Sequence, residues 1–475
     1  MENEYFKQTT EKLRLLPSVD ALLQTETARK IISRAGVNYA TDLARTATGV
    51  LRAEMLKNIR DEKFANPTRA DLLKKAEEHL HHFGEFEQAT RLRRVINATG
   101  VIVHTNLGRA PLSENAVKAL VENASRYCTL EYDAAAGKRG RRGARAENLL
   151  AELVGAESAL VVNNCAAAAF LVLTVLARGG EVIISRGELV EIGGDFRVPD
   201  VMEQSGAILK EVGTTNRTKI SDYERAFSEN TRLITRVHPS NYRIVGFTAA
   251  PDLSELAQLA HGKDVLLYED AGSGAMFDLS EYGLRDEPVI ADSIKAGADV
   301  VTFSGDKLLG GVQSGLIVGR GEVVERIRKH PLYRALRVDK LIYAALEATL
   351  ESFRRETHFV EIPVLRMLSM TGAELKTRAS KFARKSDKNR GDKSLEIELV
   401  EGNSVVGGGS APLAHPATTL LALKHREMSA TKLEETLRLS KPPIIARILE
   451  DKVLIDLRTI SESEEVELLG ILENI

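Results

Sequence analysis

The chain has 475 residues, which is long enough for two or three domains with cores of their own. With 43% hydrophobic and 28% charged residues it has the composition of a globular protein, and its net charge of −2 gives no overall attraction to nucleic acid. The N-terminus lacks the apolar core of a signal peptide, and the longest apolar run, residues 165–177, is too short to span a bilayer. Two cysteines without C-x-x-C spacing favour a reducing compartment, so we expect a cytoplasmic protein without a membrane partner.

Residues 1–80 are predicted to form a small helical domain. Apolar positions recur at helical spacing in residues 19–23, where Pro17 and then Ser18 or Asp20 supply a helix start. A second, charged helix is predicted over residues 69–82, and residues 83–86 (FGEF) are expected to form a linker.

Residues 90–338 are predicted to form a large α/β domain, because short β-rich runs alternate there with helical stretches. This alternation indicates a mostly parallel sheet with helices on both faces, in which ligands bind beyond the carboxyl ends of the strands. The predicted strands are residues 159–163, 181–185, 207–213, 232–238, 265–270, 299–305 and 315–319.

Residues 339–475 are predicted to form a smaller α+β C-terminal domain that opens with a long helix over residues 339–356. The polar segment 385–394 is expected to be a surface loop, and residues 407–409 (GGG) a flexible turn. Further strands are predicted at residues 395–400 and 452–457, and further helices at residues 429–437 and 463–472.

Lys307 is the foremost candidate for chemistry. It follows a predicted buried strand that ends in Ser304, a candidate cofactor contact, and the surrounding glycines let a bulky cofactor approach the backbone. Burial would favour the neutral amine that a Schiff base needs. The competing interpretation is an exposed loop lysine beside Asp306, since most lysines lie on the surface.

Two further strand ends complete a candidate site for pyridoxal 5′-phosphate (PLP). Asp270 ends a second strand and would pair with the protonated pyridine nitrogen, which keeps PLP an electron sink. Asn164, Cys165 and Ala166 open a helix after a third strand, where backbone amides would hold the cofactor phosphate. Taken singly, these features are also typical of an aspartate in a glycine-rich turn and of an asparagine N-cap. Together they favour PLP, with Lys307 as its Schiff-base partner and without a metal.

Five long motifs run through the chain: residues 13–20 (LRLLPSVD), 94–109 (RVINATGVIVHTNLGR), 185–194 (SRGELVEIGG), 211–217 (EVGTTNR) and 304–311 (SGDKLLGG). On these motifs, nearly the whole chain resembles the bacterial selenocysteine synthases, the L-seryl-tRNA(Sec) selenium transferases. The chain departs from the family pattern at Val312, Ser314 and Pro239, none of which is a proposed catalytic group.

The resemblance implies a fold-type-I PLP-dependent transferase that assembles as a homodecamer, a pentamer of dimers. It implies conversion of seryl-tRNA(Sec) to selenocysteyl-tRNA(Sec) through a PLP-bound dehydroalanyl intermediate, with selenophosphate as the selenium donor. The motifs NLGR and YRALRVDK assign Arg109, Arg334 and Arg337 to the donor, and arginine forks do suit oxyanions. The competing interpretation for Arg334 and Arg337 is that both are exposed charged side chains on one helix. Asp306 would assist a proton transfer beside Lys307, or have a structural role.

Recognition of the tRNA body by residues 1–80 comes from the resemblance alone, because residues 1–90 carry as many acidic as basic side chains. The basic segment 138–145 (KRGRRGAR) is an RNA contact or a solvated loop. One alternative function is a PLP-dependent lyase or aminotransferase acting on a small amino acid without tRNA, which the N-terminal helical domain argues against. Another is a non-catalytic RNA-binding or scaffold protein, which the intact Lys307 and Asp270 argue against.

Overall fold

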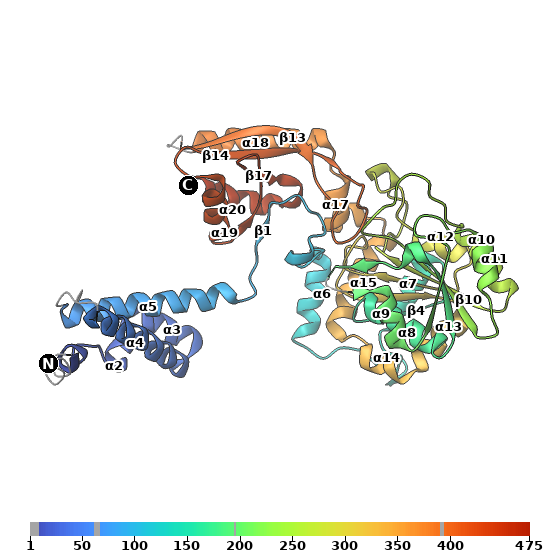
Figure 1. The fold of residues 1–475 in the computed structure, drawn as a ribbon, viewed down its shortest axis with the longest axis horizontal. Helices are drawn as coiled ribbons and strands as arrows, with labels where there is room; N and C mark the ends of the chain where they lie inside the picture. Colours follow the sequence, from blue (N-terminus) through green and yellow to red (C-terminus); the bar gives the residue numbers. More distant parts are fainter. Residues whose placement is uncertain (1–8, 61–66, 194–195, 390–393) are drawn as a thin grey trace. The chain divides into compact units, whose positions relative to one another are not determined.

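The computed structural model describes residues 9–60, 67–193, 196–389 and 394–475. The chain divides into two compact units, Met1–Arg94 and Val95–Ile475 (Figure 1). Nowhere in the described ranges is there a helix with the length and apolar character needed to cross a membrane.

The first unit is helical, as predicted, and consists of α2 (Val19–Leu23), α3 (Glu26–Ala35), α4 (Val37–Arg60) and α5 (Arg69–Thr90). The side chains of Ser18 and Thr25 cap α2 and α3 by accepting hydrogen bonds from backbone amides three residues ahead. The linker expected at residues 83–86 is wrong, because α5 continues through it. Gly84 is a packing residue there, since an added Cβ would lie 3.1 Å from Ile31 Cδ1. The buried side chains of α4 that form the core are Ala40, Ala44, Ala47, Leu51 and Met55.

The second unit is built on a seven-stranded sheet of order β4-β12-β11-β10-β9-β5-β8. Among these strands, β12 alone is antiparallel to its neighbours, so the other six end at the same edge of the sheet. The mostly parallel sheet predicted from the alternating pattern is therefore confirmed. The strands are β4 (Ser158–Val162), β5 (Glu181–Ser185), β8 (Ile208–Val212), β9 (Thr231–Val237), β10 (Leu266–Gly272), β11 (Val300–Ser304) and β12 (Gly315–Gly319).

Helices cover both faces of this sheet, and successive strand residues alternate between two hydrophobic clusters. In β10, for example, Leu267 packs in one cluster and Tyr268 in the other. One face carries α8 (Cys165–Ala177), α9 (Val198–Ser205) and α13 (Gly321–Lys329). The opposite face carries α7 (Ala144–Val154), α10 (Ile220–Ala226), α11 (Leu253–Gly262), α12 (Ile290–Lys295) and α15 (Lys340–Arg354).

The C-terminal part of this unit has a four-stranded antiparallel sheet of order β13-β14-β17-β16. Its strands are β13 (Leu395–Asn403), β14 (Ala417–His425), β16 (Arg447–Leu449) and β17 (Lys452–Asp456), covered by α18 (Gly372–Asn389), α19 (Ala430–Arg438) and α20 (Glu462–Leu472). The loop expected over residues 385–394 is wrong for residues 385–389, which continue α18, while residues 390–393 lie outside the described ranges. The turn expected at residues 407–409 is present, closed by the Ser410 amide donating to the Gly407 carbonyl.

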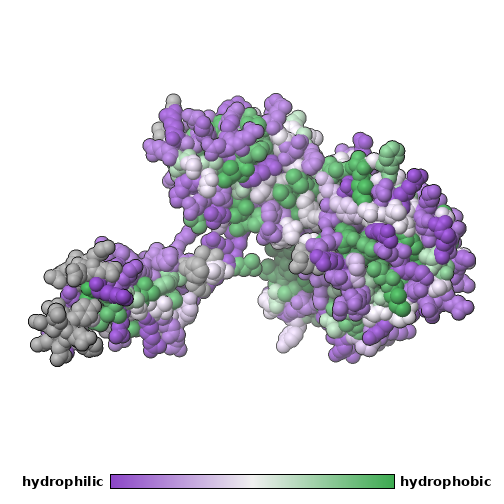
Figure 2. Space-filling view, viewed as in Figure 1, coloured by the Kyte–Doolittle hydropathy of each residue, from purple (hydrophilic) through white to green (hydrophobic). Residues whose placement is uncertain are grey.

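The beginning of the second unit is tied to its end, because β1 (Ile96–Asn97) pairs in parallel with β15 (Ile444–Ile445). On the face shown in Figure 2, hydrophilic and hydrophobic side chains are mixed over this unit. The remaining elements are α6 (Glu114–Ala124), α14 (Pro331–Leu336), α16 (His358–Glu361), α17 (Pro363–Ser369), β2 (Tyr132–Asp133), β3 (Lys138–Arg139), β6 (Glu191–Ile192), β7 (Phe196–Arg197), η1 (Thr105–Leu107), η2 (Arg186–Glu188), η3 (Ser280–Tyr282) and η4 (Leu457–Thr459).

Candidate functional site

Lys307 is buried just beyond the end of β11, with only 5% of its surface exposed. Backbone hydrogen bonds fix the turn that holds it: the Gly310 amide donates to the Lys307 carbonyl at 3.0 Å, and the Gly311 amide to the Gly305 carbonyl at 2.8 Å. The Leu308 amide donates to the Ser273 carbonyl in the loop after β10 at 3.0 Å. Lys307 is therefore a side chain of the sheet edge rather than an exposed loop lysine.

Asp270 lies in the neighbouring strand β10 and is buried against Cys165, whose Sγ donates to Asp270 Oδ1 at 3.4 Å. Burial raises the pKa of Asp270, while the Cys165 thiol, the nearby Lys307 and the Thr302 hydroxyl oppose the rise. Burial and the adjacent Asp270 raise the pKa of Cys165 well above its ordinary value, so the thiol stays protonated and can donate. Three strand ends thus bring Lys307, Asp270 and Cys165 into one cluster, in which Lys307 and Asp270 are buried and Cys165 is half-buried.

The candidate phosphate turn follows β4 and opens α8. Asn164 caps this helix, since its Oδ1 accepts from the Ala167 amide at 2.8 Å. The amides of Cys165 and Ala166 belong to the first helical turn, where N–H groups have no intrahelical acceptor, so they suit an anion. Strand β12 passes so close that a Cβ at Gly315 would lie 1.9 Å from the Asn164 carbonyl oxygen, which explains the glycine there.

Arg109 and Asp306 form an ion pair beside Lys307, with Arg109 Nη1 2.9 Å from Asp306 Oδ2. A tight turn presents the arginine, because the His104 carbonyl accepts from the amides of both Leu107 and Arg109, and Arg109 has a left-handed φ of 62°. The Asp306 side chain is 6% exposed and that of Arg109 33%. Asp306 thus orients one edge of the guanidinium and leaves the rest of it partly open to solvent.

Arg337 and Arg334 are placed differently from one another. Arg337 forms an isolated bridge with Val162 beside the candidate phosphate turn, and its Nη1 lies 3.6 Å from Glu131 Oε1. Arg334 is an exposed side chain of α14. Among the hydrogen bonds and ion pairs of the described residues, none brings either arginine to Lys307.

The basic segment 138–145 is held by acidic side chains of its own unit. Arg139 and Arg142 each lie 2.9 Å from a carboxylate oxygen of Glu131, and together they lower the pKa of Glu131, Arg142 most. Arg145 pairs with Glu347 at 2.9 Å and also with Glu351. These pairs neutralise much of the positive charge that made the segment a candidate RNA contact.

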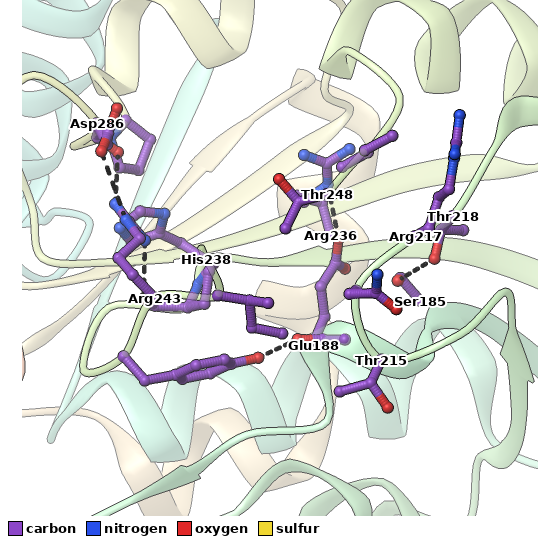
Figure 3. A pocket seen from close by; sticks show the side chains of 18 of the residues that line it. Ser185, Glu188, Thr215, Arg217, Thr218, Arg236, His238, Arg243, Thr248 and Asp286 are labelled. Carbon is purple, nitrogen blue, oxygen red and sulfur yellow. Dashed lines mark hydrogen bonds and ion pairs between the residues drawn. The ribbon is translucent and has the colours of Figure 1, made fainter. Parts of the chain in front are cut away.

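A cavity of about 400 Å³ lies at the same sheet edge, beyond β5, β8 and β9 (Figure 3). Neither Lys307 nor Asp270 lines it. Inside it, Arg236 Nε lies 3.1 Å from Glu188 Oε1, and burial raises the pKa of Glu188 to about 7 against the attraction of Arg236. Burial also raises the pKa of Glu269 on the adjacent strand. Other polar side chains that line it include Thr215, Arg217, Tyr242, Arg243 and Thr248.

Three residues of this region were not identified from the sequence: Thr302, Glu188 and Arg236. The Thr302 hydroxyl lies 2.8 Å from the Tyr268 hydroxyl and contributes to the hydrogen bonding of Asp270. The sequence does not single out Arg236, because the predicted strand 232–238 also contains Arg232, Thr235 and His238. Glu188 lies within the motif of residues 185–194, but the motif does not show which charge it faces.

The chain is similar to known proteins of one family over most of its length. A family profile described as L-seryl-tRNA selenium transferase matches residues 95–461. The chain is 46% identical over 468 residues to the L-seryl-tRNA(Sec) selenium transferase of Alkaliphilus metalliredigens, covering 98% of each chain. It is 51% identical over 377 residues to that of Geobacter metallireducens, covering 79% of this chain and 81% of the relative.

Among solved structures, the chain is similar to D-glucosaminate-6-phosphate ammonia-lyase, with a TM-score of 0.56 at 19% identity. The match covers 82% of this chain and 97% of that chain. At this identity the likeness concerns the fold alone, and it confirms the predicted α/β fold class.

Proposed function

Because this chain belongs to the L-seryl-tRNA selenium transferase family, we propose that it converts seryl-tRNA(Sec) to selenocysteyl-tRNA(Sec), with PLP bound at Lys307 and selenophosphate as the selenium donor. The observation that carries the proposal is the cluster of Lys307, Asp270 and Cys165 at the carboxyl ends of three strands. In open α/β sheets this edge is where ligands bind.

The residues at this edge suit PLP. Lys307 would hold the cofactor covalently, Asp270 would pair with its pyridine nitrogen, and the amides of Cys165 and Ala166 would bind its phosphate, with Ser304 close by. Burial raises the pKa of Asp270 in spite of the nearby Lys307, and a protonated pyridine would add a direct positive partner for its carboxylate. When bound, PLP would supply an electron sink for the charge that develops at the seryl α-carbon.

Different side chains of the protein would transfer the proton and bind the selenium donor. Once the seryl α-amine has displaced Lys307 from the cofactor, the freed Nζ would take the seryl α-proton, and the β-hydroxyl would depart as water. The selenium of selenophosphate would then add at the β-carbon while the α-carbon takes back a proton, and water would cleave the Se–P bond and release phosphate. Arg109, Arg334 and Arg337 bind the donor oxyanion, and Asp306 holds the Arg109 guanidinium in place through their 2.9 Å ion pair.

The proposal includes partners and assembly. The first unit would bind the body of tRNA(Sec), and the chain would work in the cytoplasm as a homodecamer of five dimers. Its exposed cations include Arg29 and Arg34 on α3, which are available to phosphates.

A single-turnover assay tests the reaction, with PLP, selenophosphate and seryl-tRNA(Sec), and with free serine and seryl-tRNA(Ser) as controls. The wild-type chain should form selenocysteyl-tRNA with the cognate tRNA alone. Lys307→Ala should lose the visible absorbance band of lysine-bound PLP and on the order of 10³-fold or more in turnover. Lys329→Ala, at an exposed position of α13, is the matched control and should change neither.

Two outcomes would contradict the proposal. An unchanged band and full turnover in Lys307→Ala would reject the assigned lysine. A PLP band in the wild type, with reaction on free serine and on no tRNA, would move the function to the small-molecule lyases.

A further inference from the structure

A buried pair of His238 and Glu287 lies beside the Lys307 cluster and has no part in the chemistry proposed above. His238 is the first residue after β9, and its Nε2 lies 3.5 Å from Glu287 Oε2. The two side chains are 10% and 2% exposed. Burying such groups costs free energy unless partners compensate, so the pair requires an explanation.

Glu287 joins three segments of the second unit. Its Oε1 accepts from the Ala411 amide at 2.6 Å, at the end of the glycine turn 407–411. Its other contacts are with Ser273, in the loop after β10, and with His238. Burial opposes ionisation, but the nearby His238, the Ser273 hydroxyl and the Ala411 amide outweigh it and hold the pKa of Glu287 below its ordinary value. Glu287 therefore faces the imidazole as a carboxylate.

His238 connects this carboxylate to the candidate cofactor site. Its backbone amide donates to the Asp270 carbonyl at 2.9 Å, so the residue is fixed to the strand that carries the proposed pyridine partner. Its ring lines the cavity at the sheet edge, where Figure 3 shows it close to Arg243. Neither His238 Nε2 nor Glu287 Oε2 has a fully formed hydrogen bond within the described residues.

A carboxylate that holds one imidazole nitrogen fixes the ring and leaves the other nitrogen for a bound group. We propose that Glu287 is a positioning residue, which orients the His238 imidazole for hydrogen bonding to the substrate bound over the ends of β9 and β10. This inference rests on the proposed function, because it takes the seryl group bound with PLP as that substrate.

The test uses the full-length, PLP-loaded enzyme and the variants Glu287→Gln, His238→Gln and the double variant. Each single variant should shift the visible absorbance band of the cofactor, whose electronics respond to neighbouring groups. Each should also lower kcat for seryl-tRNA(Sec) on the order of tenfold or more, with KM within about twofold. The double variant should be no worse than either single one, because the two residues act as a unit.

Asp292→Asn is the matched control. Asp292 is an acidic residue of α12 that does not line the cavity; its side chain is 69% exposed and 3.5 Å from Lys295, so the band and kcat of this variant should stay at wild-type values. If Glu287 and His238 only stabilise the fold, the variants will have a lower melting temperature but an unchanged band and kcat, and this result would overturn the proposal. Additive effects of the two substitutions in the double variant would also overturn it. If Glu287→Gln fails to fold, the test rests on His238→Gln alone. A wild-type absorbance band and a wild-type kcat in the His238→Gln variant would overturn the proposal.

Failure of the proposed function is distinguishable from failure of this inference. A wild-type chain that shows the PLP band but no reaction on seryl-tRNA(Sec) rejects the function. The absorbance measurements on the variants still support or overturn the pairing of Glu287 with His238, because they need no tRNA.

Discussion

At Glu188 a single buried carboxyl makes the stability of the second unit depend on pH. Burial raises the pKa of Glu188 from 4.5 to about 7, against the attraction of Arg236 and a hydrogen bond from the Val237 amide. Because the folded pKa lies above the unfolded one, the carboxyl's contribution is fully present below the unfolded pKa and is lost as the pH rises through about 7. At about 1.4 kcal/mol for each pH unit, that loss is on the order of 3 kcal/mol.

Glu188→Gln should therefore flatten the pH dependence of stability. Glutamine keeps an acceptor for the Val237 amide but cannot ionise, so the melting temperature should change less between about pH 5 and about pH 8 than in the wild type. Thermal unfolding followed by circular dichroism measures this. Glu211→Gln, on a side chain that is 44% exposed and paired with Arg186, should keep the wild-type pH dependence. An unaltered slope in Glu188→Gln would contradict the prediction.

Some site residues follow from the order of the strands alone, whereas the buried charges at the edge of the sheet do not. That Lys307, Asp270 and Cys165 would meet was predictable, because the carboxyl ends of parallel strands share an edge. Glu188 and Arg236 were not predictable. Strands covered on both faces are expected to be apolar, and only the folded chain shows that these two opposite charges face each other.

At the scale of elements, Arg458 of η4 fastens the C-terminal sheet to the segments around it. It is 1% exposed, and its guanidinium donates to Ser404 Oγ at 2.8 Å and to three backbone carbonyls. Burial lowers the pKa of Arg458, while Asp456 opposes the fall. The carbonyl acceptors belong to Met367 and Met370, around the end of α17, and to Ala417 at the start of β14.

Arg458→Ala should destabilise the second unit by about 3–5 kcal/mol, because it leaves four acceptors without their buried donor and removes the positive charge near Asp456. The free energy of unfolding from urea titration measures this. Arg426→Ala is the matched control, since Arg426 pairs with Glu396 at 3.4 Å while both side chains are about two-thirds exposed. It should cost no more than about 1 kcal/mol, and equal losses in the two variants would contradict the argument.

Two segments that were expected to be loops are helical for the same physical reason. Residues 385–389 are polar, but Phe382, Ala383 and Ser386 are buried at helical spacing along α18. Gly84 is a turn residue by composition, whereas in α5 it leaves room for Ile31. Local composition favours a loop in both cases, and the tertiary contacts that override it are not visible in the sequence.

At the scale of the whole molecule, the division into two units follows the change from helical to alternating patterns near residue 90. Helix α5 runs unbroken to Thr90, and the first unit ends at Arg94. Both sheets, their hydrophobic clusters and all the candidate site residues belong to Val95–Ile475. A cut at Arg94 should therefore leave the cofactor site intact, whereas a cut at residue 80 would pass through a helix.

Removal of residues 1–94 should thus separate the two proposed binding activities. PLP should still bind Lys307 and give its visible absorbance band, while affinity for tRNA(Sec) should fall by on the order of 100-fold as phosphate contacts are lost. In the full chain, Arg29→Glu with Arg34→Glu should weaken tRNA binding and flatten its salt dependence, without changing the PLP band. Filter binding at several salt concentrations measures both. Full affinity for tRNA(Sec) in the truncated chain would contradict this prediction and place the RNA contact in the second unit. The segment 138–145 is basic, but it would have to exchange its carboxylate partners for phosphates in order to bind RNA.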